Sequence, residues 1–284
     1  MKKLFILILP LCILSFESFS QTNNFIDPSG NTIGSRIRVP VGYQRETLPE
    51  ESFGYFLRNF VLEPDGTKVY YYNGQEKKNP VYVAVLKADV GQRDLQQCAD
   101  AVIRLRAEYL YHHQCYDEIR FNFTNGFQAN YRKWAEGNRI RVKGNTVSWY
   151  QGASADYSYP VFRRYLDCIF SYAGTLSLSK ELTPVAFQEI QTGDVLIQGG
   201  SPGHAVIVVD LAVNAQGQKV FLLAQSYMPA QSIHILKNPE NPALSPWYEA
   251  DNSTVVQTPE WTFTTKDLKR FNSQFLYKQV HPSL

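Results

Sequence analysis

Three apolar segments follow one another between residues 194 and 226, and they constrain the fold more than any other part of the chain. We predict strands at 194–198, 204–213 and 219–226, because each segment contains a run of apolar residues. The turn at 214–217 contains Asn214 and Gly217 and closes a simple hairpin between the last two strands. The segments therefore predict an antiparallel sheet in the second half of the chain.

Helices are predicted mainly before this sheet. The clearest helix covers 94–112, where Asp94 and Gln97 have capping-box spacing and apolar residues recur at helical intervals. Another helix begins at Pro160 and ends before Gly174, as helices prefer. Shorter elements are expected as helices at 50–60 and 266–271, strands at 81–86 and 119–123, and a hairpin at 139–150. Helices followed by a sheet predict the α+β class.

The first twenty residues have the pattern of a cleavable signal peptide. Lys2 and Lys3 precede an apolar run at 4–14, and Ser18 and Ser20 are the small residues that a signal peptidase reads. We expect cleavage between Ser20 and Gln21 and an exported protein, periplasmic or extracellular. No later stretch of about 18 apolar residues follows, so we expect no stable membrane insertion.

The remaining residues, 21–284, are expected to form a single α+β domain. We divide it into an N-terminal extended unit at 37–90, a core at 91–236 and an irregular C-terminal tail at 237–284. Lysine and arginine total 28 against 26 acidic residues. Without a basic stripe this balance gives no reason to expect a nucleic-acid partner.

Removing the signal peptide leaves Cys98, Cys115 and Cys168, and an odd number in an exported protein requires at least one free thiol or an intermolecular bridge. Cys168 is expected in the core, and Cys98 is either a core residue or a reactive thiol. Cys115 follows the His112–His113 pair, but adjacent histidines point to different helix faces and no Cys-x-x-Cys is present. We therefore expect no metal site, and no organic cofactor. His234 and His281 lack a local partner and are expected at the surface.

One segment has a pattern suited to chemistry. A strand after Gly193-Asp194 enters a Gly/Pro loop, and Gly203-His204-Ala-Val-Ile-Val opens the next strand. A histidine at a strand edge is held by a rigid scaffold, which suits a general base. This segment resembles the histidine segment of the papain-like NlpC and CHAP cysteine peptidases and amidases. The chain as a whole also resembles an uncharacterised family of exported Bacteroidota proteins.

The resemblance to the NlpC and CHAP enzymes implies a papain-like core and a nucleophilic cysteine early in an upstream helix. It assigns Cys98 as the nucleophile and His204 as the base, and the Gln-Cys pair assigns Gln97 to the oxyanion hole. If Cys98 is the nucleophile, the helix N-terminus and His204 are expected to lower its pKa below the free value of about 8.5, whereas a core cysteine would be protected. The chain departs from those families in two respects. Roughly a hundred residues separate Cys98 from His204, more than is usual there, and the cysteine is not followed by the small polar residue and glycine that are common in NlpC enzymes.

The third site residue follows from strand register. A simple hairpin pairs Val213 with Gln218, which places Val206 opposite Gln225 and makes Gln225 a diagonal neighbour of His204 on the same face. If the strand register slips by one residue, Ser226 replaces Gln225 as the neighbour of His204. Asp210 lies on that face too, but six strand residues, about 20 Å, separate it from His204.

These residues predict an exported cysteine peptidase or amidase. The resemblance implies that its ligand is a cell-envelope peptide, such as a peptidoglycan stem. Two alternatives stay open: a non-catalytic envelope binding protein on the same fold, and a structural or interaction module without a cleft function.

Overall fold

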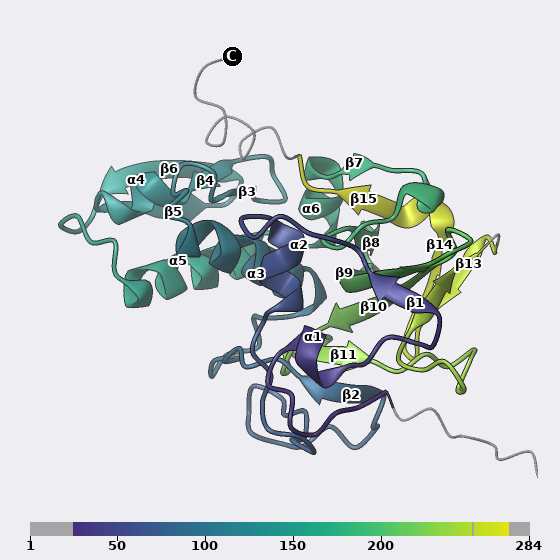
Figure 1. Ribbon diagram of the computed structural model, residues 1–284. Coiled ribbons are helices and arrows are strands. Elements are labelled where there is room, and N and C mark those ends of the chain that lie inside the picture. Colours follow the sequence, from purple (N-terminus) through teal and green to yellow (C-terminus); the bar gives the residue numbers. More distant parts are fainter. Residues whose placement is uncertain (1–24, 252, 273–284) are drawn as a thin grey trace, which may run out of the picture.

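The computed structural model describes residues 25–251 and 253–272. The predicted signal peptide, its cleavage site and His281 lie outside these ranges. The described chain is a mixed α+β structure dominated by antiparallel strands (Figure 1), as the order of the predicted elements indicated. Within these ranges no helix is both long and apolar enough to cross a membrane.

The longest helix, α3, comprises Cys98–His112 and begins four residues later than predicted. The start moves because the Asp94 carboxylate accepts hydrogen bonds from Gln97 Nε2 and the Ala230 N–H and does not cap the helix. Asp100 Oδ2 instead accepts the Gln97 N–H at 3.0 Å. The other helices are α1 (Ile33–Arg36), α2 (Phe53–Arg58), α4 (Tyr131–Ala135), α5 (Tyr159–Tyr172) and α6 (Thr175–Glu181), with 3₁₀ turns η1 (Phe187–Glu189) and η2 (Thr265–Asp267).

A nine-stranded sheet forms one side of the molecule, on the right in Figure 1. Its path is β2-β11-β10-β9-β8-β15-β7, while β1 also pairs with β9 and β12 with β10. These strands are β1 (Tyr43–Arg45), β2 (Tyr82–Val85), β7 (Thr183–Pro184), β8 (Val195–Gln198), β9 (His204–Asn214), β10 (Lys219–Gln225), β11 (His234–Leu236), β12 (Tyr248–Ala250) and β15 (Leu268–Arg270). Three separate hairpins are β3–β4 (Arg120–Asn122, Gln128–Asn130), β5–β6 (Asn138–Lys143, Thr146–Gln151) and β13–β14 (Val255–Gln257, Thr262–Thr264).

The segment at 237–284, expected to be irregular, contributes strands instead. The predicted helix at 266–271 is the 3₁₀ turn η2 followed by β15, and Leu268 pairs with Leu196 of β8. The Leu268 side chain is fully buried. Burial at this sheet position decides the local structure, because tertiary packing overrides weak helix propensity.

The β9–β10 hairpin contains a β-bulge that the sequence did not indicate. Val213 pairs with Lys219, one residue away from the predicted partner, and the register shifts between Leu222 and Leu223. Beyond the shift Ala224 opposes Ile207, so the same register brings Gln225 opposite Val206 as predicted. A bulge adds one residue to one strand, and here it cancels the earlier offset.

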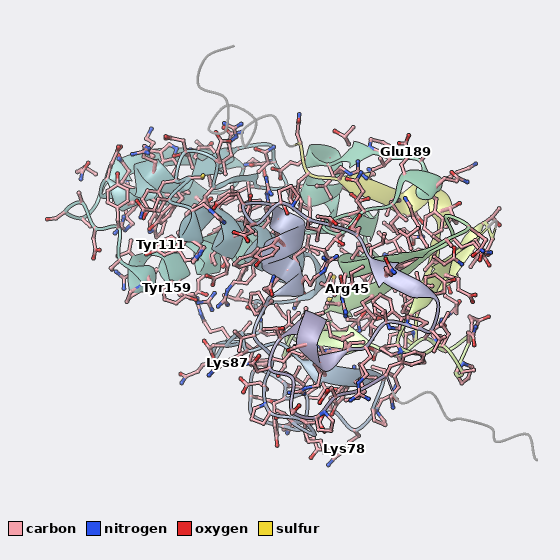
Figure 2. The ribbon with its side chains drawn as sticks, viewed as in Figure 1. Arg45, Lys78, Lys87, Tyr111, Tyr159 and Glu189 are labelled. Carbon is pink, nitrogen blue, oxygen red and sulfur yellow. The ribbon has the colours of Figure 1, made fainter. Side chains whose placement is uncertain are left out.

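The sheet separates two apolar clusters. Ala205, Ile207 and Val209 of β9 pack into the cluster that contains α3 and α5, whereas Val206 and Val208 pack into the cluster that contains β14. In Figure 2, Tyr111 and Tyr159 lie together at the helical end of the molecule, and their ring centroids are 5.8 Å apart.

A charged group is fixed within the sheet at Asp210. Its carboxylate is fully buried and accepts hydrogen bonds from Arg45 Nε of β1 and Arg58 Nε of α2, each at 2.6 Å. Arg45 lies beside the central strands in Figure 2. Asp210 therefore ties β1 and α2 to the sheet and does not orient His204, as its distance along the strand indicated.

Candidate active site

Cys98 is the first residue of α3 and lies in the wall of a pocket of 660 Å³. Its side chain is largely buried, with an exposed fraction of 6%. The pocket lies between the start of α3, the connection from α5 to α6 and the loop from β8 to β9. Its lining is Asp94, Leu95, Gln97–Asp100, Thr124, Phe170, Ser171, Ala173–Leu176, Gly200–Gly203 and Met228.

Hydrogen bonds hold the segment before Cys98 against the end of β10. The Ala230 N–H donates to Asp94 Oδ1 at 2.6 Å. The Ser226 hydroxyl lies 2.8 Å from the carbonyl oxygens of both Gln96 and Gln231. Ser226 thus bonds backbone carbonyls and does not take the orienting role that a register slip would have given it.

The opposite wall of the pocket depends on a close approach at Gly203. A Cβ atom there would lie 2.5 Å from Thr175 Oγ1 and 2.6 Å from the Gly200 carbonyl oxygen. No side chain fits, so glycine lets the β8–β9 loop pack on the start of α6. Thr175 Oγ1 also donates to the Gly200 carbonyl at 3.2 Å, which holds the β8–β9 loop that precedes His204.

His204 opens β9, and its ring Nε2 lies 2.8 Å from Gln225 Oε1 on β10. Both side chains are buried. Gln225 Nε2 in turn donates to Glu260 Oε2 at 2.7 Å. Since a carboxylate only accepts hydrogen bonds, the Gln225 amide nitrogen faces Glu260 and its oxygen faces His204. The proton of the neutral imidazole is therefore on Nε2, which leaves Nδ1 as the basic nitrogen.

Two residues far from β9 in sequence complete this network. Lys77 Nζ donates to Glu260 Oε1 at 2.6 Å, and both side chains are mostly buried. Glu260 lies in the turn between β13 and β14, and the next residue, Trp261, packs on the His204 ring at 5.3 Å between centroids. Sequence reasoning missed these residues because neither segment carries a motif, and only the tertiary fold brings them to His204.

The expectation that His234 is a surface residue is wrong. Its side chain is fully buried, and Nδ1 donates to the Ser232 carbonyl oxygen at 2.8 Å. Nε2 then accepts from Gln225 Nε2 at 3.4 Å. Burial lowers the pKa of His234 to about 3, so this ring is neutral at pH 7 and serves as an acceptor for Gln225.

The structure brings the Cys98 sulfur to the start of β9. Backbone N–H groups of Ala99 and Ala205 interact with the sulfur and lower the pKa of the thiol, and Ala205 directly follows His204. The His204 ring lies on the β14 side of the sheet, packed against Phe263 and Trp261. Among the described residues no hydrogen bond joins the thiol to the ring, and Gly203 rather than His204 lines the pocket.

The expectation of a lowered Cys98 pKa is wrong. Burial, followed by the charge of Asp100, raises the pKa of the thiol to about 11 despite the backbone N–H groups. Burial also lowers the pKa of His204 to about 4, although the hydrogen bond to Gln225 opposes this shift. Thiol and imidazole are both neutral at pH 7, because burial disfavours each charged form.

The raised pKa predicts the pH dependence of thiol labelling. The thiolate is the reactive form, and its fraction rises about tenfold per pH unit below the pKa. Iodoacetamide labelling of Cys98, followed by mass spectrometry, should therefore keep accelerating from pH 7 to pH 10. In the urea-unfolded chain the rate should level off near pH 8.5, the value of a free thiol. A plateau below pH 8 in the folded protein would contradict the burial effect.

The remaining predicted site residues have clear positions. Gln97 lines the pocket, and its Nε2 donates to Asp94 Oδ1 at 3.1 Å. Cys115 and Cys168 are each partly buried, and no disulfide joins them. Within residues 25–251 and 253–272 no group of three or more His, Cys, Asp or Glu side chains could hold a metal ion.

A family model described as "Domain of unknown function (4846)" matches residues 33–270. The chain belongs to this family. The match to the DUF4846 family includes all residues of the network from Lys77 to Glu260 as well as Cys98. No curated protein and no solved structure matches the chain.

Proposed function

We propose that this DUF4846 protein is an exported cysteine peptidase or amidase with a papain-like core. The observation that supports this most is the position of Cys98: the first residue of a 15-residue helix, in a pocket wall, with the Ala205 N–H at its sulfur. Because Ala205 follows His204, the Cys98 sulfur lies against the backbone at the start of β9, the strand that begins with the proposed base. The His204 tautomer set by Gln225 leaves Nδ1 to accept a proton.

In the proposed reaction the Cys98 sulfur attacks a substrate carbonyl carbon while His204 Nδ1 takes the thiol proton. The sulfur–carbon bond forms, and the carbonyl π electrons move to oxygen. As the carbonyl re-forms, the C–N bond breaks and His204 protonates the leaving amine. Water then attacks the thioester with His204 as base, which releases the acid and restores the thiol.

In the proposed mechanism the proton moves from Cys98 to His204 as the sulfur attacks, because both groups are neutral in the free protein. Transfer from Cys98 to His204 creates a thiolate and an imidazolium together, and opposite charges at short range stabilise each other. The partial positive charge at the N-terminus of α3 favours the same thiolate. The ring and the thiol approach each other in the substrate complex, as expected for catalytic hydrogen bonds that are long in the free enzyme.

The oxyanion would form at the same helix end. The first N–H groups of a helix have no intrahelical partner, so the Cys98 N–H is available to a developing negative charge. Gln97 also lines the pocket, and Asp94 orients its amide through a hydrogen bond. Gln97 is the proposed second donor.

The pocket lining supports a peptide substrate from the cell envelope, with peptidoglycan stems as the proposed class. Leu176 and Met228 are apolar rim residues with substantial exposure. Asp94 and Asp100 are the acidic residues of the lining, and no lysine or arginine accompanies them; burial raises the pKa of Asp100 well above its usual range, so Asp94 carries this argument. By charge complementarity, such a lining favours amide- or amine-bearing segments over carboxylate-bearing ones.

The experiment that tests this function replaces Gln225 with leucine. Loss of the amide leaves His204 Nε2 without its acceptor, so kcat for release of peptide fragments from peptidoglycan digests should fall about a hundredfold. KM should change little, because Gln225 does not line the pocket. Liquid chromatography with mass spectrometry measures the fragments.

Glu260→Gln and Gln44→Leu give this experiment its comparison. Glu260→Gln breaks the pair with Lys77 and should reduce kcat less and shift its pH profile, since Gln225 loses its charged acceptor. Gln44 is exposed on β1, so its replacement should leave kcat unchanged. A folded Gln225→Leu protein with wild-type kcat would contradict the role of Gln225.

One observation favours a second candidate, a non-catalytic envelope binding protein. The thiol has a pKa of about 11, and no hydrogen bond joins it to His204 within the described chain. In such a protein the pocket would bind the peptide without turnover. Binding of intact stem peptides by calorimetry, with no fragment released over days, would favour this candidate.

A further inference from the structure

A second pocket, of 330 Å³, lies away from Cys98 and shares no lining residue with the first. It is formed where α2, α3 and the segment before β8 meet. The lining residues are Glu46, Leu48, Pro49, Ser52–Gly54, Arg106, Gln191–Asp194 and Arg270. One residue of this lining, Arg106 of α3, has unusual surroundings for a charged side chain.

Arg106 is buried without an acidic partner. Its exposed fraction is 8%, and it forms no hydrogen bond or ion pair with the described residues. Arg36 and Arg104, the other buried arginines of the described chain, each pair with a carboxylate. Burial lowers the pKa of Arg106, and the charge of Glu118 opposes this effect only from beyond ion-pair distance.

Aromatic rings hold the Arg106 guanidinium in place. Its central carbon lies 5.0 Å from the Phe53 ring centroid, 5.2 Å from that of Tyr109 and 5.3 Å from that of Phe271. These contacts compensate part of the cost of burying the cation, but aromatic faces accept no conventional hydrogen bond. None of the Arg106 nitrogens is fully buried without a hydrogen-bond partner. Because these nitrogens have no partner among the described residues, they are accessible, and their N–H groups face the pocket that the residue lines.

The other charges of the lining decide what Arg106 can bind. Arg270 donates two hydrogen bonds to Asp194, at 2.6 and 2.8 Å, and these two charges compensate each other. Glu46 accepts a hydrogen bond from Thr192 Oγ1 at 2.9 Å and places a carboxylate in the lining. Glu46 opposes a multiply charged anion, whereas a planar group with a single charge matches the guanidinium fork.

We propose that this pocket binds the carboxylate of a small monoanionic ligand, with Arg106 as the residue that recognises it. The two carboxylate oxygens accept hydrogen bonds from the Arg106 guanidinium, and the aromatic rings fix its plane. The site is independent of the proposed hydrolase activity, because it uses none of the residues around Cys98.

Thermal unfolding of the full chain in sodium acetate tests this site, with sodium chloride at equal ionic strength as the reference. Acetate should raise the unfolding midpoint saturably, by about 3 °C at ten times its dissociation constant. Arg106→Met keeps the apolar stem among the rings and should abolish the shift. Arg106→Lys keeps the positive charge but lacks the two parallel N–H donors of the guanidinium, and should weaken acetate binding about fivefold. This variant tests the role of Arg106 if the methionine variant does not fold.

Arg141→Met is the matched control, since Arg141 also stacks on an aromatic ring, that of Tyr150, but on the exposed β5–β6 hairpin. This variant should retain the full acetate shift. No saturable shift in the wild-type protein, or an equal shift in Arg106→Met, would overturn the site. A larger saturable shift with inorganic phosphate would overturn the carboxylate assignment.

Discussion

Replacement of Cys98 by alanine should reduce hydrolysis of peptidoglycan stem peptides at least about a thousandfold, because no thioester can form without the sulfur. Serine at this position should restore little activity, since a hydroxyl holds its proton far more tightly than a thiol. Fragment release by mass spectrometry, at substrate concentrations well above KM, measures the loss in kcat. The dissociation constant of the intact peptide should stay near the wild-type value.

The two other cysteines of the described chain provide the control. Cys115 and Cys168 do not line the pocket, so Cys115→Ala and Cys168→Ala should keep near wild-type kcat. An active Cys98→Ala protein would remove the hydrolase mechanism. Equal peptide binding by wild type and Cys98→Ala, with turnover by neither, would instead identify a binding protein.

The largest loss of stability is expected from Asp210→Ala. The substitution leaves Arg45 and Arg58 without their shared carboxylate at a fully buried position. Removing one partner of a buried ionic cluster costs about 3 to 5 kcal/mol. Urea unfolding followed by circular dichroism should show a lower free energy of unfolding, and Asp210→Asn should show a smaller loss because the amide oxygen still accepts one hydrogen bond.

Asp167→Asn is the comparison for this effect. Asp167 pairs with Arg93 at 2.6 Å, and both side chains are substantially exposed. Exposed ion pairs contribute about 0 to 1 kcal/mol, so the unfolding free energy should hardly change. Equal losses for Asp210→Ala and Asp167→Asn would show that the buried cluster does not hold β1 and α2 on the sheet.

Local sequence patterns predicted the elements whose conformation depends mainly on their own residues. Strands β8, β9 and β10 were predicted to within one residue at each end, because apolar residues make up most of each strand. The short strand β15 was mistaken for a helix because its three residues carry little pattern of their own. Its conformation is set by the open edge of β8, which is distant in sequence.

The same distinction applies to the candidate site. The contact between Gln225 and His204 followed from hairpin register, despite a bulge that the sequence did not indicate. The sign of the Cys98 pKa shift was wrong because helix position was visible in the sequence and the degree of burial was not. Glu260 and Lys77 were missed because their pairing depends on β14 covering the face that carries His204.

The strand order of the nine-stranded sheet has a consequence for how the chain is made. β8 is followed in the sheet by β15, although some seventy residues separate them in the sequence. During synthesis, one edge of β8 therefore has no partner until the last described strand has been translated. An open edge of buried, β-branched residues is a template for pairing with other chains. A truncation that removes residues 268–270 should thus yield a protein that aggregates, even though every residue of the candidate site is present.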